Sequence, residues 1–198
     1  MANRIVDLSV WEDGIDYDAV LRHSDGAILK GGMFVDGVFT ADPTFKKHYE
    51  ELKNRFFPVG VYFYGNSSTP TEWEEEACNI LDFLEDKQFE LPIFYHSIES
   101  STTAISVILN KLKNNGYYVG YNATSQNLNR HIDTSKLHDY ILWVSQPDDT
   151  LKPGIYATYH MWQYSLEYKI DSFTTGVSYV YEDFEAIIKY QKLNGFGS

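Results

Sequence analysis

The sequence has few cysteines and few basic residues, and both shortages exclude whole classes of protein. Cys78 is the only cysteine among 198 residues, which rules out an internal disulfide and a cysteine metal cluster, and we expect its thiol to be buried. The chain has 16 Lys and Arg against 28 Asp and Glu, a formal net charge of −12 at pH 7. Nucleic acids and anionic lipids both attract basic surfaces. The sequence therefore argues against both as partners.

Long apolar runs are also missing. No run approaches the roughly 18 residues that span a membrane, and the first residues lack the basic and apolar regions of a signal peptide. The histidines are scattered, with no ligand pair at helical spacing, so the sequence predicts no metal site and no cofactor. Because the sequence has no linker or low-complexity tract, we expect a single domain over residues 1–198. Because it has no signal peptide, we expect the protein to be made in the cytoplasm. The oligomeric state stays open.

Aromatic residues, in contrast, are plentiful. They make up 16% of the chain, with 16 Tyr, 12 Phe and 4 Trp. An aromatic face packs well on the apolar C–H surface of a sugar ring, while the polar tips of Tyr and Trp form hydrogen bonds. This density favours a flat or sugar-like ligand, although any single Tyr is more commonly part of the core or the general surface.

Hydrophobic patterning predicts an α/β barrel. The expected strands are 4–10, 26–30, 59–64, 91–98, 118–121, 140–145, 160–165 and 177–181, with a hairpin at 33–40, and the expected helices are 16–22, 42–55, 71–86, 102–114 and 125–133. Asp42 is the expected N-cap of the second helix, with Pro43 at its first position. Five strand–helix units followed by three strands with little helix indicate a TIM-like barrel with an irregular closing side.

Functional groups of a parallel barrel lie at the C-terminal ends of its strands. Asp7 ends the first strand and is the leading candidate. The other candidates are Tyr62, Tyr64, His96, Tyr121, Trp143, Gln146, Trp162, Gln163 and Tyr164. Aromatics and amides outnumber carboxylates in this set, which favours a sugar-contacting groove over phosphate or metal chemistry.

Several of these residues lie in short segments whose order along the chain matches that of a known protein family. The segments are Val6-Asp7-Leu8-Ser9 with Trp11 and Gly14-Ile15-Asp16-Tyr17, then Val59-Gly60-Val61-Tyr62-Phe63-Tyr64, Leu91-Pro92-Ile93-Phe94-Tyr95, Leu142-Trp143-Val144-Ser145-Gln146 and Trp162-Gln163-Tyr164-Ser165. Together they resemble the landmarks of glycoside hydrolase family 25 lysozymes over nearly the whole chain. The resemblance implies a flattened barrel that cleaves the muramic acid–glucosamine bond of peptidoglycan with four acids at its strand ends.

Only one of those four acids is expected here. The first falls on Asp7, whereas His96, Ile98 and Ser178 stand at the other three positions on an ungapped alignment with the family pattern. Glycoside hydrolysis normally needs one carboxylic acid to protonate the leaving oxygen and a second carboxylate to attack or to activate water. The resemblance therefore predicts the family's fold and ligand with an incomplete catalytic set.

Three hypotheses follow from this combination. In the first, the domain binds cell-wall glycan and its hydrolysis is impaired or lost. In the second, it is an active muramidase that uses Asp7 and Glu99, which a one-residue bulge in the fourth strand would turn into the cleft. In the third, it is a structural or interaction protein that keeps only the barrel. The missing signal peptide fits a phage-type lysin released to the wall by other means, and it fits a cytoplasmic or virion-associated protein equally well.

Overall fold

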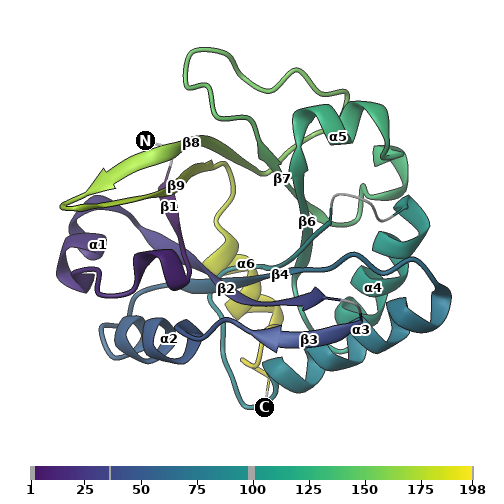
Figure 1. Cartoon of the computed structure of the whole chain (residues 1–198), viewed down its shortest axis with the longest axis horizontal. Helices are drawn as coiled ribbons and strands as arrows, with labels where there is room; N and C mark the ends of the chain where they lie inside the picture. Colours follow the sequence, from purple (N-terminus) through teal and green to yellow (C-terminus); the bar gives the residue numbers. More distant parts are fainter. Residues whose placement is uncertain (1–2, 36, 98–100, 198) are drawn as a thin grey trace.

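Strands and helices alternate through the first two thirds of the chain, as the computed structural model of residues 3–35, 37–97 and 101–197 describes (Figure 1). The described strands are β1 (Asn3–Leu8), β2 (Gly26–Val35), β3 (Val38–Ala41), β4 (Val59–Tyr64), β5 (Ile93–His96), β6 (Val119–Thr124), β7 (Ile141–Ser145), β8 (Met161–Ile170) and β9 (Phe173–Val180). The helices are α1 (Tyr17–His23), α2 (Phe45–Lys53), α3 (Pro70–Leu84), α4 (Thr102–Asn114), α5 (Ser125–Arg130) and α6 (Phe184–Gln191), with short 3-10 turns η1 (Val10–Glu12) and η2 (Thr134–Lys136).

Eight of these strands close into a barrel, which confirms the predicted fold class. The pairs β1–β2, β2–β4, β4–β5, β5–β6, β6–β7 and β7–β8 are parallel. The ring is completed by β9, which runs antiparallel to both β8 and β1. β3 lies outside the ring and pairs antiparallel with β2. The mouth of the barrel, where the parallel strands end, is therefore built mainly by β1, β2 and β4 to β8.

Apolar side chains form two layers, one inside the barrel and one between the barrel and its helices. The inner layer centres on Phe94 and Trp143, and Phe184 and Ile188 of α6 close it from the bottom of the barrel. The outer layer is larger and buries apolar residues of α1 to α4 against the strands. Because the inner layer is filled, a ligand cannot enter the inside of the barrel below its mouth.

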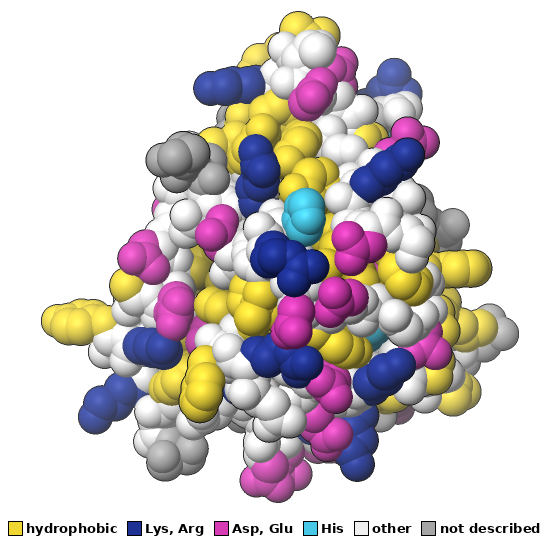
Figure 2. All heavy atoms as spheres, turned by 90° about the vertical axis from the view of Figure 1, so that its left-hand side faces the viewer, with side chains coloured by type: hydrophobic (Ala, Val, Ile, Leu, Met, Phe, Trp, Pro, Cys, Tyr) yellow, Lys and Arg dark blue, Asp and Glu magenta, His cyan; other side chains and the backbone are white. Residues whose placement is uncertain are grey.

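The face over α1 and α2 carries charges of both signs side by side (Figure 2). Lys47 contacts Asp13 at 2.6 Å and Arg55 contacts Asp18 at 3.1 Å. These two basic residues are thus paired with acids, and blue and magenta side chains are interspersed over the face. None of the described helices is long and apolar enough to cross a bilayer.

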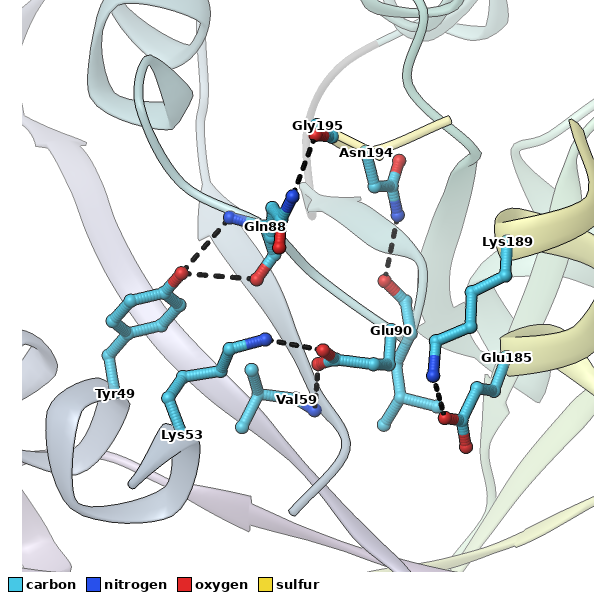
Figure 3. A network of polar contacts seen from close by, with 10 residues as sticks. Tyr49, Lys53, Val59, Gln88, Glu90, Glu185, Lys189, Asn194 and Gly195 are labelled. Carbon is cyan, nitrogen blue, oxygen red and sulfur yellow. Dashed lines mark hydrogen bonds and ion pairs between the residues drawn. The ribbon is translucent and has the colours of Figure 1, made fainter. Parts of the chain in front are cut away.

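A polar network closes the bottom of the barrel, where the parallel strands begin (Figure 3). Glu90 pairs with Lys53 and accepts a hydrogen bond from Val59 N at 3.3 Å. Asn194 is fully buried, donates from Nδ2 to Leu91 O at 3.0 Å and accepts from Tyr118 N at 2.7 Å. The segment after α6 is thereby tied to the starts of two strands.

The structure confirms several predicted elements and corrects others. The strand at 59–64 and the helix at 102–114 have the predicted bounds. Asp42 is not the N-cap of α2, because Thr44 occupies that position and Asp42 Oδ1 accepts from Thr44 N at 3.0 Å instead. Cys78 is exposed on α3, not buried. The helix α6 and the long β8–β9 hairpin were not predicted.

Candidate functional site

Side chains alternate along each strand, and this alternation decides which residues face the inside of the barrel at its mouth. The strand register aligns Tyr64 with His96, His96 with Asn122, and Asn122 with Trp143 across β4 to β7. The Trp143 ring packs against Phe94 of the inner layer, with ring centroids 5.0 Å apart. These four aligned residues therefore point into the barrel.

Asp7 of β1 is held at the same end by residues of β7, β8 and β9. Gln163 Nε2 donates to Asp7 Oδ2, and Thr175 Oγ1 donates to Asp7 O. Gln163 is oriented in turn, because its Oε1 accepts from Ser145 Oγ at 2.5 Å. Gly176 leaves room for the carboxyl group, since a Cβ at this position would overlap Asp7 Oδ2. The Asp7 side chain is thus fixed by its surroundings.

These surroundings alter the acidity of Asp7. Burial raises the pKa of Asp7 to about 7, the negative charge of Glu12 adds to the rise, and the hydrogen bond from Gln163 opposes it. Asp7 Oδ1 is buried and has no hydrogen-bond partner among the described residues. A carboxyl group with this pKa exchanges its proton near neutral pH. It can therefore either donate or accept a proton there.

Two more carboxylates hold the turn that follows Asp7, and the sequence prediction gave neither of them a role there. Glu12 Oε2 accepts from Ser9 N at 2.8 Å in a capping box that holds η1, and Asp42 Oδ2 accepts from Val10 N at 3.3 Å. Burial raises the pKa of Glu12, while its bonds to Ser9 oppose the rise. Both groups anchor the turn that presents Trp11, whose side chain is 83% exposed. The Ser-x-x-Glu spacing at 9–12 was the signal for Glu12.

His96 occupies a position where the family pattern has an acid. Its Nδ1 lies 2.5 Å from Asn122 Oδ1, and Asn122 Nδ2 donates to Trp143 O at 3.2 Å. Because the second bond turns the amide oxygen toward the histidine, Nδ1 carries the proton and donates. Burial lowers the pKa of His96, although Asn122 opposes this shift. The ring is stacked on Tyr64, with centroids 5.2 Å apart, and is neutral near pH 7.

Ser178 stands at another of the expected acid positions. It is fully buried, and its Oγ accepts a hydrogen bond from Trp143 Nε1 at 3.0 Å. It therefore supports the floor of the mouth. Ile98 and Glu99 lie outside the described residues, so the bulge that would place Glu99 in the cleft stays a prediction.

Not every predicted site residue reaches the mouth. Tyr121 is fully buried in the outer layer and donates to Ser97 O at 2.7 Å. Trp162 donates to Gln146 O at 2.9 Å, and Tyr164 is stacked on Tyr179. These three side chains belong to the opposite face of their strands from Asn122 and Gln163, which are the inward neighbours. The expectation that Tyr121, Trp162 and Tyr164 line the groove is therefore corrected.

Gln146 lies just beyond β7 and is also engaged within the chain. Its Nε2 donates to Leu151 O at 3.0 Å, which holds the start of the loop between β7 and β8 in place.

We use the name mouth cluster for the set of side chains that do converge at the ends of the parallel strands. Its members are Asp7, Tyr62, Tyr64, His96, Asn122, Trp143 and Gln163.

Tyr62 is the member of the mouth cluster with the most available polar group. Its ring packs edge-on against Trp143, with centroids 6.4 Å apart. Burial raises the pKa of Tyr62, and the nearby charges of Asp7, Asp42 and Glu12 raise it further. Its hydroxyl is therefore a neutral donor at any physiological pH, and no described residue forms a hydrogen bond with it.

The close contact at Gly176 gives a first test of this geometry. Gly176→Ala should destabilise the fold by about 1–3 kcal/mol, because the new methyl group displaces both Asp7 Oδ2 and Gln163 Nε2. Gly154→Ala is the matched control, since no heavy atom lies within 4 Å of its added Cβ, and its effect should stay within about 0.5 kcal/mol. Urea unfolding measures both. Equal effects of the two substitutions would contradict the packing described here.

Comparisons with known proteins identify the family of this chain. The sequence model of glycosyl hydrolases family 25 matches residues 6–173. The chain belongs to glycosyl hydrolase family 25. The match runs from the second half of β1 to the first residue of β9, so it includes every member of the mouth cluster. A search of curated proteins found no match.

Solved structures share the fold of this family 25 domain at low sequence identity. The CTP1L endolysin is 21% identical with a TM-score of 0.81, over 96% of this chain and 69% of that one. The catalytic domain of the endolysin ply40 from bacteriophage P40 of Listeria monocytogenes is 16% identical with a TM-score of 0.79, over 96% and 98%. The autolysin LytC of Streptococcus pneumoniae, in complex with a synthetic peptidoglycan ligand, is 21% identical with a TM-score of 0.76, over 91% and 47%. The chain thus spans about half the length of LytC.

Proposed function

We propose that this family 25 domain binds the glycan of bacterial peptidoglycan through the mouth cluster and that its hydrolytic activity is strongly reduced or lost. The observation that carries the proposal is the chemical content of the mouth. Tyr62 and Tyr64 offer aromatic rings and Asp7 offers a carboxyl group, whereas His96 and Ser178 are neutral groups already bonded within the protein. Family membership and the LytC complex support the choice of glycan.

The reduced activity follows from the number of acids that can take part. One carboxyl group must protonate the leaving oxygen while a second one attacks or activates water. Asp7 is the only carboxyl group of the mouth cluster, and Glu12 and Asp42 are each held by a backbone amide of the turn after β1. Loss of general acid–base assistance typically lowers a rate by about 10²–10⁴. Similarity to two endolysins supports action at the cell wall, as a phage-type lysin or a virion-associated protein.

An active muramidase is the second candidate, and the acidity of Asp7 favours it. A raised pKa near 7 is typical of the general acid in a glycosidase, which must hold its proton until the bond breaks. This mechanism needs a second carboxylate, and Glu99 is the residue the sequence offers for that role.

Purified, insoluble peptidoglycan separates these candidates. The native chain should be retained on it at low salt, and it should clear a cell-wall suspension at least about 100-fold more slowly than a family 25 lysozyme with all four acids. Rapid clearing that Asp7→Asn and Glu99→Gln both abolish would establish the muramidase instead. Absence of both retention and clearing would overturn both candidates and favour a protein that has kept only the barrel.

The same change, tyrosine to phenylalanine, at two positions tests where the glycan binds. Tyr62→Phe keeps the packing on Trp143 but removes the free hydroxyl, so retention on peptidoglycan should fall about 3- to 10-fold. Tyr190→Phe on α6 removes the same atom from a side chain that is 89% exposed, far from the mouth, and should have no effect. Equal retention of both variants would contradict binding at the mouth.

A further inference from the structure

Two cavities adjoin each other at the closed end of the barrel, where β6, β7 and β8 begin. Their volumes are about 440 and 430 Å³, within the range of about 300–1,000 Å³ that is usual for small-molecule sites. The side chains of His138, Tyr140 and His160 line both cavities, so the two form one continuous groove. We call it the lower groove. It lies at the opposite end of the strands from the mouth cluster and shares no residue with it.

His160 and Glu182 form the most specific polar feature of the lower groove. Nδ1 of His160 accepts from Leu142 N at 3.0 Å, so the ring proton is on Nε2. Nε2 lies 3.7 Å from Glu182 Oε1, which is too far for a direct hydrogen bond. A donor and an acceptor at this separation are joined by a group that accepts from one and donates to the other. A hydroxyl group does both.

Tyr140 provides a further polar group where the two cavities meet. Its side chain is only 7% exposed, yet its hydroxyl is not enclosed and forms no hydrogen bond with any described residue. Burial raises the pKa of Tyr140, and the nearby charge of Asp139 raises it further, so the hydroxyl is neutral. It can therefore donate to a ligand oxygen or accept from a ligand hydroxyl.

Aromatic rings stand on both sides of these polar groups. Tyr156, in the loop between β7 and β8, lines the first cavity and is fully exposed. Tyr117 and Tyr118 line the second cavity and are partly buried. Aromatic faces pack on the apolar C–H surface of a sugar ring while neighbouring polar groups bind its hydroxyls. The groove therefore offers both kinds of contact that a sugar needs.

The charges in the lower groove disfavour ionic ligands of either sign. Asp139 and Glu182 line the second cavity beside a single Lys113, in a chain with a formal net charge of −12, so an anion is repelled. Nζ of Lys113 lies 5.5 Å from the centre of the Tyr140 ring and occupies the place that a ligand cation would take over it. A neutral ligand rich in hydroxyl groups meets neither obstacle.

We propose that the lower groove binds a neutral oligosaccharide, one of whose hydroxyl groups accepts from His160 Nε2 and donates to Glu182 Oε1. This inference goes beyond the proposed function, because it assigns a second binding site remote from the mouth. A glycan network that meets both sites is held at two points of one domain. Two linked sites retain such a network more strongly than either site alone.

Histidine ring signals in a proton–carbon NMR spectrum test the two sites separately. Addition of tri-N-acetylchitotriose, a neutral trisaccharide, should shift the signals of His138 and His160 in the lower groove. The signal of His96 reports binding at the mouth in the same titration. His23, at the end of α1, lines neither cavity of the groove and should keep its signal.

Three variants determine whether the groove residues bind the sugar. Glu182→Ala removes the bridging acceptor and Tyr140→Phe removes the hydroxyl, so each should raise the dissociation constant read from His160 about 3- to 10-fold and leave that read from His96 unchanged. Tyr62→Phe should do the reverse. Asp149→Ala removes an exposed acid from the loop between β7 and β8, away from both cavities, and should change neither constant.

Unchanged His138 and His160 signals, or a His160 constant that neither Glu182→Ala nor Tyr140→Phe alters, would overturn the lower groove as a site. A shift of the His96 signal would then leave the proposed function standing. Tighter binding of inorganic phosphate or trilysine than of chitotriose at His160 would overturn the neutral ligand class. A shift at His160 with none at His96 would support the groove and contradict binding at the mouth, and no shift at any of the three histidines would overturn both.

Discussion

Replacement of Asp7 by asparagine should stabilise the folded protein by an amount that grows as the pH rises from about 4 to 7. In the unfolded chain Asp7 ionises near its ordinary pKa of 3.8, whereas in the folded chain it ionises at about 7. Between these values the unfolded state releases a proton that the folded state keeps, so folding becomes less favourable with increasing pH. The free energy of unfolding of the native protein is therefore lower at pH 8 than at pH 4 by up to about 4 kcal/mol, because each unit of pKa difference between the two states corresponds to about 1.36 kcal/mol.

Asparagine is close to the neutral acid in shape and removes this cost. Its amide oxygen can still accept from Gln163, and it has no charge to bury. Urea unfolding at pH 4, 6 and 8 should show nearly equal stability of the two proteins at pH 4 and the largest gain of Asp7→Asn at pH 8. Asp149→Asn should show no growing gain. A loss of stability in Asp7→Asn that is the same at every pH would mean that Asp7 is not buried as described.

Asn194→Ala should be among the most damaging single substitutions in the chain. The side chain satisfies the N–H of Tyr118 and the C=O of Leu91 at the closed end of the barrel, and its removal leaves both groups buried without a partner. Each such group costs about 1–3 kcal/mol. Asn194 also has a φ of 52°, a left-handed conformation that alanine tolerates poorly. We expect a loss of about 3–6 kcal/mol.

Two glycine substitutions divide this loss into its causes. Asn194→Gly relieves the left-handed backbone but still removes the side-chain bonds, so it should cost about 1 kcal/mol less than Asn194→Ala. Lys192→Gly changes a residue that is exposed and also left-handed, with a φ of 55°, and should be neutral or slightly stabilising. Urea unfolding compares the three variants. Similar stability of Asn194→Ala and the native chain would show that the hydrogen bonds of Asn194 are unimportant.

The parallel part of the barrel was predictable because its signals are local. The strand at 59–64 is an apolar run, and the helix at 102–114 has Ser101 as its N-cap and Gly116 beyond its end. The β8–β9 hairpin lacks such signals, since its outer half, including Tyr168 and Thr174, carries polar residues at the positions of both faces. Its strands extend because they pair with each other, a property of the tertiary structure.

The sequence predicted the location of the candidate site. It did not predict residues whose role depends on which face of a strand they occupy or on contacts between distant parts of the chain. The expected strand at 118–121 ended on Tyr121, whereas the observed strand continues to Thr124 and places Asn122 inward. Asp7 was found because it ends an apolar strand. Asp42 was not found, since only the folded chain brings it to Val10, 32 positions away. An alternation argument extended by one residue would have found Asn122.

The position of β1 in the ring has a consequence for how the chain folds. β1 lies between β2, which follows it closely, and β9, which comes some 170 residues later. One edge of β1 therefore has no partner until almost all of the chain is available, and pairings over such long separations form slowly. An exposed strand edge can pair with a second molecule in the meantime. Refolding yield should thus fall with protein concentration, and a circular permutant in which a flexible linker joins residue 198 to residue 1, so that β9 and α6 precede β1 in the sequence, should reduce this loss.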